Sequence, residues 1–169
     1  VTTVRSADGS LVPGEFRGTA SITCNAASLA TSSGKVVRVF DTTVSREVYR
    51  GEFLQNIKTV EHTDSNRERL LLITFENRAL LVSTRTNSRL DLLDPGETVT
   101  ARHVPPGGGT MFLATSAARL VALSGTTGEL LWMRRSTHPL ISIDVSAAGD
   151  RVVAADSVGN ISFWNVQDK

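Results

Sequence analysis

The stretch ISIDVSAAGDRVVAADSVGNISFWN, residues Ile141–Asn165, decides the fold of this chain. Its first segment, Ile141–Val145, alternates apolar and polar residues with a period of two, the pattern of a β-strand that packs one face and exposes the other. Turn-forming residues follow at Ala148–Asp150 and at Ser157–Gly159, and an apolar run lies after each turn. The stretch therefore predicts three short strands joined by tight turns.

The same order of strands and turns recurs along the chain. The last residues of the third apolar run in each unit are Phe40, Ser83, Leu123 and Trp164. These positions are 43, 40 and 41 residues apart. A further apolar run is marked nine residues later by Tyr49, Leu92 and Trp132. An alternating segment opens each unit at Ser21–Cys24, Lys58–His62, Thr98–Ala101 and Ile141–Val145. Repeats of about 40 residues with four strands each are typical of a β-propeller, in which small twisted sheets pack radially and bury faces that no single sheet could bury.

We therefore predict an all-β fold, a β-propeller segment of about four blades with four antiparallel strands per blade. The predicted blades cover 19–53, 54–96, 97–135 and 136–169, and the last of them lacks its outer strand. Residues 1–18 are predicted to supply the outer strand of a preceding blade or of the last blade. Either Ser10–Val12 closes the last blade, or the chain is a slice of a longer propeller that needs further blades or another chain to cover its apolar faces.

One stretch also fits a helix. Between Glu47 and Val60, the residues Phe53, Leu54 and Ile57 are spaced as on a helical face. Gly51 lies inside this stretch and no convincing cap precedes it, so two strands are the favoured interpretation.

The last unit resembles a WD40 repeat. Ile141–Ala154 and Gly159–Asn165 follow the order of that repeat, and Trp164 with its following Asn stands where the family's Trp-Asp pair lies. Phe40 with its following Asp occupies the same place in the first unit, and His138 is similar to the His of the family's Gly-His pair, without the Gly. The resemblance implies a propeller that binds other proteins through its loops.

The resemblance departs from the WD40 pattern at one buried position. The Asp expected six residues before the Trp is replaced by Val158 in the last unit and by Gly34 in the first. The family's buried Asp-His-Ser-Trp hydrogen-bond set therefore cannot form in its usual way, and we expect packing to hold these blades instead. The third unit differs again, because LVALSGTTGELLW, residues Leu120–Trp132, is similar to the PQQ-type propeller repeat. A degenerate WD40 propeller is the first choice and a PQQ-like propeller the runner-up.

Composition narrows the functional classes. A formal charge of +1 over 169 residues gives no overall field of the kind that marks nucleic-acid or membrane-surface binders. The lone Cys24 excludes an intrachain disulfide and a cysteine-based zinc cluster, which favours a reducing compartment. The longest apolar clusters, such as Leu70–Ile73 and Ala79–Val82, are too short to span a membrane. We predict an intracellular protein, cytoplasmic or nuclear, with no membrane span.

Catalytic or metal-binding groups do not converge in the sequence. His62 and His103 lie near the ends of the first strands of their units and could form a metal pair, but no third ligand follows at metal spacing. Ser142, Asp144 and His138 have the composition of a catalytic triad, but nothing in the pattern activates the serine. We therefore predict no enzymatic activity, no cofactor and no metal.

The predicted function is that of a protein-interaction scaffold within a larger assembly, with other protein chains as partners, able to complete the propeller. Loops carry function on such a rigid ring, and the candidate contact loops are Glu61–Arg69, Arg102–Thr110 and Arg134–Pro139. The candidate partner-binding residues are Arg67, Arg69, Arg102, His103, Arg134, Arg135 and His138. Two alternatives stay open. One is an RNA-associated scaffold that uses exposed arginines, although the sequence lacks the interleaved aromatic residues on which RNA bases stack. The other is a PQQ-like propeller domain of an enzyme or assembly factor.

Overall fold

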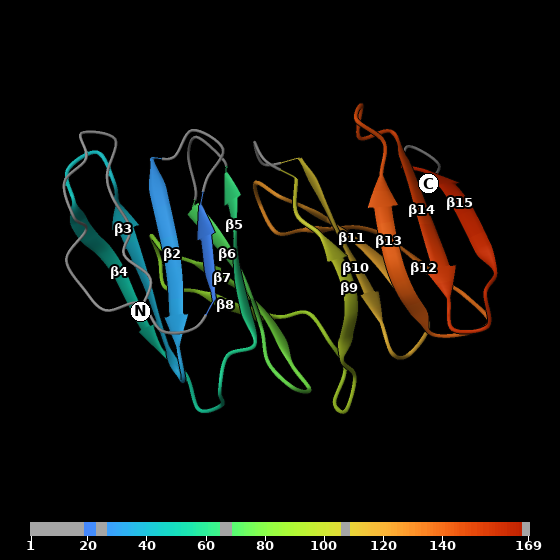
Figure 1. Cartoon of the computed structure of the whole chain (residues 1–169), viewed down its shortest axis with the longest axis horizontal. Coiled ribbons are helices and arrows are strands. Elements are labelled where there is room, and N and C mark those ends of the chain that lie inside the picture. Colours follow the sequence, from blue (N-terminus) through green and yellow to red (C-terminus); the bar gives the residue numbers. More distant parts are fainter. Residues whose placement is uncertain (1–18, 23–26, 65–68, 106–108, 167–169) are drawn as a thin grey trace.

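The computed structural model of the chain describes residues 19–22, 27–64, 69–105 and 109–166 (Figure 1). Within these residues every regular element is a β-strand, and the strands form four antiparallel sheets. The fold is therefore all-β, a propeller segment of about four blades, as the sequence predicts. Cys24, Arg67 and the predicted outer strand at Ser10–Val12 lie outside the described residues.

The strands follow one another in sequence order within each sheet. Blade 1 contains β1 (Ala20–Ile22), β2 (Ser28–Ser33), β3 (Val36–Asp41) and β4 (Arg46–Glu52). Blade 2 contains β5 (Thr59–Asp64), β6 (Arg69–Thr74), β7 (Ala79–Ser83) and β8 (Arg89–Asp91). Blade 3 contains β9 (Val99–His103), β10 (Thr110–Thr115), β11 (Arg119–Ser124) and β12 (Leu130–Arg135). Blade 4 contains β13 (Leu140–Val145), β14 (Arg151–Asp156) and β15 (Ile161–Asn165).

The four blades stand side by side in sequence order, from blade 1 at the left of Figure 1 to blade 4 at the right. Their core is divided into three apolar clusters, each built from two adjacent blades. The clusters pair Val39 with Val82 between blades 1 and 2, Leu81 with Leu123 between blades 2 and 3, and Ala122 with Val152 between blades 3 and 4. Because alternate residues of a strand point to opposite faces, blades 2 and 3 are apolar on both sides.

These contacts define equivalent positions on the third strand of every blade. Val39, Leu81 and Ala122 each pack toward the following blade, and we call this side of a blade its forward face. The hairpins of blades 3 and 4 match, because Ala114 pairs with Leu120 and Ala155 pairs with Ile161 as the last pairs before the turn. Phe163 of β15 is therefore the forward-facing equivalent in blade 4.

The structure corrects two anchors of the predicted repeat in blade 2. Val82, which packs toward blade 1, is the equivalent of Leu123 and Trp164, so the predicted anchor Ser83 is one residue too late. A one-residue slip in an assignment exchanges the two faces of a strand. Both faces of blade 2 are covered by neighbouring blades, so its strands are apolar throughout and no polar residue in the sequence marks which face is which. Leu92 also lies beyond the outer strand β8.

The segment that also fits a helix in the sequence is part of two strands. The helical alternative for Glu47–Val60 is wrong, because β4 runs to Glu52 and β5 begins at Thr59.

Gly128 lies in the β11–β12 turn and has a φ of +76°, a backbone conformation that is unfavourable for residues with a Cβ. A Cβ at this position would also collide with Leu81 Cδ2, so the turn of blade 3 packs directly on blade 2.

Candidate functional site

Blade 4 differs from the other blades at its outer edge. Its described strands have the order β13-β14-β15, whereas each of the other three sheets has a fourth strand beside the third. Within the described part of the chain, no strand pairs with the outer edge of β15. An unpaired strand edge is a template for another polypeptide backbone, because its N–H and C=O groups are already aligned.

The hydrogen bonds at the two ends of β15 show which backbone groups face this edge. Asp156 N donates to Asn160 O over 2.9 Å, and Val166 N donates to Asp150 O over 2.8 Å. Since bonded and non-bonded pairs alternate along an antiparallel ladder, the even-numbered residues between these points bond to β14. The backbone N–H and C=O groups of Ile161 and Phe163 therefore point to the open edge.

The forward face of blade 4 is also exposed. Ile161 is 63% exposed and Phe163 is 76% exposed, although both are large apolar side chains. Their equivalents in blade 3, Leu120 and Ala122, are both 0% exposed because blade 4 covers them. Blade 4 thus has the apolar forward face of an internal blade, at the end of the row (Figure 1).

A groove of about 370 Å³ runs beside this edge. It is lined by Arg134, Arg151, Phe163, Trp164 and Asn165. Arg134 comes from β12 of blade 3, and its guanidinium lies 5.3 Å from the centre of the Trp132 ring, within cation–π range. The groove therefore combines two cationic side chains with two aromatic ones beside β15.

A hydrogen bond fixes blade 3 against the end of blade 4 behind the groove. Trp132 Nε1 donates to Val166 O over 2.9 Å. Trp132 is 9% exposed, and its ring packs against that of Phe112, with ring centres 5.9 Å apart. The Arg134 side of the groove is therefore held in place relative to β15.

Inside blade 4, a buried carboxylate makes polar contacts of its own in place of the WD40 hydrogen-bond set, which this chain cannot form in its usual way. Asp156, at the end of β14, is 3% exposed and accepts hydrogen bonds from the backbone N of Val158 (3.0 Å) and from the backbone N and the side chain of Asn160 (both 2.9 Å). Its other contact is His138 Nδ1 at 3.4 Å. Burial acts to raise the pKa of Asp156, but the hydrogen bonds from Asn160 and Val158, together with His138, hold the pKa below its ordinary value.

Blade 4 is therefore held by these polar contacts in addition to the apolar packing that the sequence analysis expects. Asp156 lies two residues before the position that the WD40 pattern reserves for an Asp, and from there it reaches both the turn and His138. The spacing of Asp156 and Asn160 across the tight turn is the sequence signal that could have indicated this arrangement.

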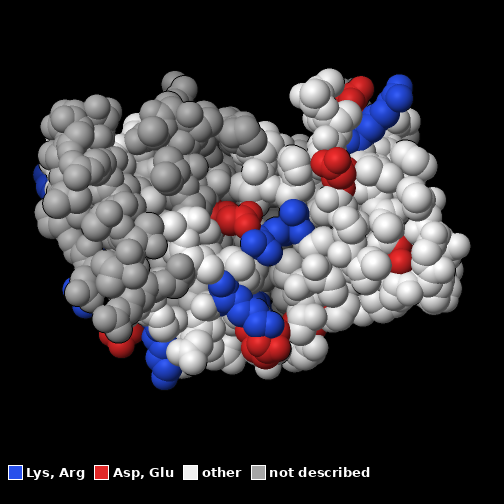
Figure 2. Space-filling view, in the orientation of Figure 1, with Lys and Arg blue, Asp and Glu red and all other residues white. Residues whose placement is uncertain are grey.

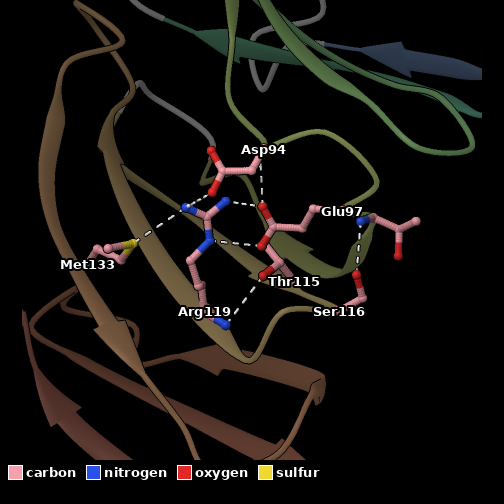
Figure 3. A network of polar contacts seen from close by, with 7 residues as sticks. Asp94, Glu97, Thr115, Ser116, Arg119 and Met133 are labelled. Atoms are coloured by element: carbon pink, nitrogen blue, oxygen red, sulfur yellow. Dashed lines mark hydrogen bonds and ion pairs between the residues drawn. The ribbon is translucent and has the colours of Figure 1, made fainter.

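A second polar network fixes the connection between blades 2 and 3. Figure 3 shows the guanidinium of Arg119, on β11, among Asp94, Glu97 and Met133. Arg119 Nε donates to Glu97 Oε1 over 2.8 Å, Nη2 donates to Glu97 Oε2, and Nη1 lies 3.1 Å from Asp94 Oδ2. The side chains of Glu97 and Arg119 are 3% and 12% exposed. This buried two-point ion pair ties the β8–β9 loop to the β10–β11 hairpin.

The predicted partner-binding residues do not form one site. Arg134 lines the groove, while Arg135 is exposed at the end of β12 and His138 contacts Asp156. Arg102 Nε lies 2.5 Å from Glu61 Oε1 on the neighbouring blade. His103 is partly exposed at the end of β9; of the rest, Arg69 begins β6 with an undescribed side chain, and Arg67 lies outside the described residues. Of the predicted side chains that the structure describes, Arg134 is thus the one that lies at the edge of β15.

The histidine pair suggested as a metal site has a different environment. His62 is 7% exposed, and its Nε2 lies 3.3 Å from Ser28 Oγ of blade 1. Across the described ranges, no group of three or more His, Cys, Asp or Glu side chains is arranged to hold a metal ion. His62 is thus part of the contact between blades 1 and 2.

Charges of both signs lie side by side on the face shown in Figure 2. Arg102 pairs with Glu61, and Lys58 Nζ lies 2.7 Å from Glu76. No helix in the described part of the chain has the length and apolar character needed to cross a membrane. The intracellular location expected from the sequence stays a prediction.

Sequence comparison identifies the repeat. A family model described as outer membrane protein assembly factor BamB, of the PQQ type, matches residues 83–168, from the end of β7 through blades 3 and 4. The chain belongs to this family. The match includes Leu120–Trp132, so the PQQ-like resemblance of that segment is supported. No curated protein has a sequence that matches the chain.

Solved structures confirm the propeller-type repeat fold. The β-propeller domain of Cps50 (Swd1) from Myceliophteria thermophila superposes with a TM-score of 0.62 at 14% identity, covering 94% of this chain and 55% of that one. The computationally designed Ika4 protein gives a TM-score of 0.62 at 10% identity, covering 90% of this chain and 93% of that one. This chain therefore spans 55% of the length of the Cps50 propeller domain.

Proposed function

We propose that this chain is a non-enzymatic protein-interaction scaffold, a propeller segment whose last blade binds another protein chain. The observation that carries the proposal is the exposure of Ile161 and Phe163, 63% and 76%, at positions whose equivalents in blade 3 are 0% exposed. Exposed apolar surface at a sheet end is characteristic of an interface, because burying it removes apolar area from water. In this proposal the partner covers the apolar forward face of blade 4.

The experiment compares the effect of the same charged substitution at two exposed, large apolar side chains. Phe163→Asp places a charge on the open face, and Leu54→Asp places the same charge at an 87% exposed residue in the β4–β5 loop. The wild-type chain is used as bait in an extract of its own organism, and each captured protein is purified and titrated by calorimetry. We expect Phe163→Asp to weaken binding at least about tenfold and Leu54→Asp to leave it unchanged.

Stability provides the control for this pair. Both side chains are mostly exposed, so in urea unfolding the free energy of unfolding of each variant should lie within about 0.5 kcal/mol of the wild-type value. A purified partner that binds Phe163→Asp as tightly as the wild type would contradict the proposal.

The family match favours a second, related role. The matching family is described as an outer membrane protein assembly factor. In an assembly factor the open blade would hold a client chain for a limited time, whereas in a permanent complex it would stay occupied. The dissociation rate of the purified partner separates the two roles: exchange with unlabelled partner within minutes supports an assembly factor, and a complex that persists for days supports a permanent scaffold.

Binding to RNA through arginines has no comparable support. Arg102 and Arg119 both engage carboxylates of their own chain. The salt dependence of the partner complex tests this point, because phosphate contacts would give a steep loss of affinity with rising salt.

A further inference from the structure

We propose that the outer edge of blade 3 is a self-association surface, at which β12 lies antiparallel beside β12 of a second copy of this chain. This contact is separate from the forward face of blade 4 and goes beyond the proposed function. Three features of β12 support it: exposed apolar side chains, backbone groups that point away from β11, and an order of charges that is complementary to itself.

The outer strands of the three four-stranded blades expose different kinds of side chain. On β4 the exposed residues are all charged: Arg46, Glu47, Arg50 and Glu52. β8 has three residues, two of which are charged. On β12 three large apolar side chains are exposed: Leu130 (60%), Leu131 (49%) and Met133 (37%). Charged side chains and short length protect a sheet edge against pairing with another chain, so β12 is the least protected of these three strands.

The backbone of β12 presents hydrogen-bonding groups at the same edge. Ser136 N donates to Ala118 O over 2.8 Å, just beyond the end of the β11–β12 ladder. Since bonded and non-bonded pairs alternate along an antiparallel ladder, the even-numbered residues back to Trp132 bond to β11. The N–H and C=O groups of Met133 and Arg135 therefore point away from β11. Within the described residues no strand pairs with this edge.

The openness of this edge does not depend on how blade 4 is completed. Blade 3 already has four strands, the same number as blades 1 and 2. A fourth strand of blade 4 would pair with β15, and a further blade would pack on the forward face of blade 4. Neither place is the outer edge of β12.

The charges along β12 match those of a second copy in antiparallel order. Glu129 directly precedes the strand and Arg135 ends it, and both side chains are exposed. An antiparallel arrangement brings Glu129 of each copy near Arg135 of the other, so the same attraction occurs twice about a two-fold axis. Leu131 and Met133 lie between these charges, and the contact removes their apolar area from water. The occupant that fits both the charges and the apolar residues is therefore a second copy of the chain.

Sedimentation velocity of the full chain between about 1 and 200 µM tests for the dimer. One strand pair is a small interface, so we expect a reversible dimer with a dissociation constant in the micromolar range. Leu131→Lys should raise this constant at least about tenfold. The matched control is Val44→Lys, which changes a 63% exposed apolar residue in the β3–β4 turn and should leave the constant unchanged. Urea unfolding of both variants checks that they are folded.

Charge reversal tests the antiparallel order. Glu129→Arg and Arg135→Glu should each weaken the dimer at least about fivefold, because each homodimer then contains two pairs of like charge. The double variant carries both reversals, which restores opposite charges at both places. Its dissociation constant should return to within about twofold of the wild-type value. In a parallel arrangement each position would meet its own equivalent, so neither the single nor the double reversals would change the dissociation constant in this way.

Hydrogen exchange distinguishes strand pairing from simple apolar docking. The amide of Met133 points to the open edge, so its exchange should slow as the concentration of the chain rises through the dissociation constant. The amide of Trp132 bonds to β11 and should be protected at every concentration. Exchange of both amides is followed by NMR on the same samples.

The proposal is overturned by a chain that stays monomeric up to about 200 µM, by charge reversals that do not weaken and then restore the dimer, or by exchange at Met133 that does not respond to concentration. Phe163→Asp should dimerise as the wild type does. Loss of the dimer in that variant would place the contact at blade 4 and would also overturn the proposal. A copy of this chain recovered from the extract counts toward the dimer alone, so the proposed function is judged separately by other captured proteins.

Discussion

The buried ion pair between Glu97 and Arg119 allows a quantitative test of how blades 2 and 3 are joined. Glu97→Gln keeps the shape of the side chain but removes the charge that faces the guanidinium at two points. Arg119 is then left 12% exposed with Asp94, whose side chain is 78% exposed, as its remaining carboxylate. Removing one partner of a buried pair costs about 3–5 kcal/mol, because the other charge stays desolvated without full compensation.

This cost is large against the total stability of a typical domain, about 5–15 kcal/mol. It corresponds to a fall in Tm of roughly 6–20 °C for a chain of this size. The assay is urea unfolding followed by far-UV circular dichroism and by tryptophan fluorescence, with the m-value checked for constancy.

The matched control is an exposed ion pair of the same two-point geometry. Arg78 Nε and Nη2 donate to Asp91 over 2.5 and 2.8 Å, but these side chains are 44% and 54% exposed. Asp91→Asn should therefore cost about 0–1 kcal/mol. A Glu97→Gln variant that loses no more stability than Asp91→Asn would refute the reasoning. A double variant with leucine at positions 97 and 119 would also refute it, if its loss of stability equals the sum of the losses in the two single leucine variants.

Three further variants test other parts of the fold. Gly128→Ala should cost about 2–5 kcal/mol, because its φ of +76° disfavours a Cβ and the added atom collides with Leu81, whereas Gly96→Ala, at φ +84° with nothing within 4 Å, should cost only about 1–2 kcal/mol. Equal costs in urea unfolding would contradict the close packing of blades 2 and 3. Because the pKa of Asp156 is lowered in the fold, its contribution to stability is complete above about pH 4 and is lost as the pH falls through the lowered pKa. Asp156→Asn should thus lower the Tm at pH 7 and flatten its acid dependence below about pH 4, and an unchanged acid profile would count against the buried carboxylate. Trp132→Phe removes the hydrogen bond to blade 4 and should cost about 1 kcal/mol, while an unaltered urea midpoint would argue against that bond.

The strand order could be predicted from the sequence because its causes are local. Alternation in Ile141–Val145 and glycine-containing turns depend on neighbouring residues, and the structure has strands and turns at these places. The register of blade 2 could not be obtained in this way. Leu81 and Val82 are both apolar and both buried, so the period-two pattern contains no residue that marks the face.

The polar contacts that position the blades were harder to predict for a different reason. Arg119 and Glu97 are 22 residues apart, and their pairing depends on how the β8–β9 loop folds back on blade 3. No local pattern distinguishes this arginine from Arg135, which lies opposite it in the register and is exposed. The predicted arginines were chosen by their position in loops. Of those that the structure describes, Arg134 lines the groove, together with Arg151, which the sequence analysis did not single out.

The open face of blade 4 could have been found from the repeat itself. Aligning Phe163 with Ala122 and Val39 shows that the fourth unit has a forward-facing apolar residue, opposite which the described residues place no outer strand. The sequence analysis concentrated on charged loop residues instead, because loops carry function on most rigid scaffolds.

Hydrogen exchange of the β15 amides in the full chain tests the openness of blade 4 most directly. Exchange is followed residue by residue by NMR at a pH where the fold is stable. We predict strong protection at Ser162 and Trp164, whose N–H groups bond to β14, and rapid exchange at Ile161 and Phe163, whose N–H groups face the open edge. Equal protection of all four amides in the isolated chain would contradict the central claim, because the edge of β15 would then already be paired.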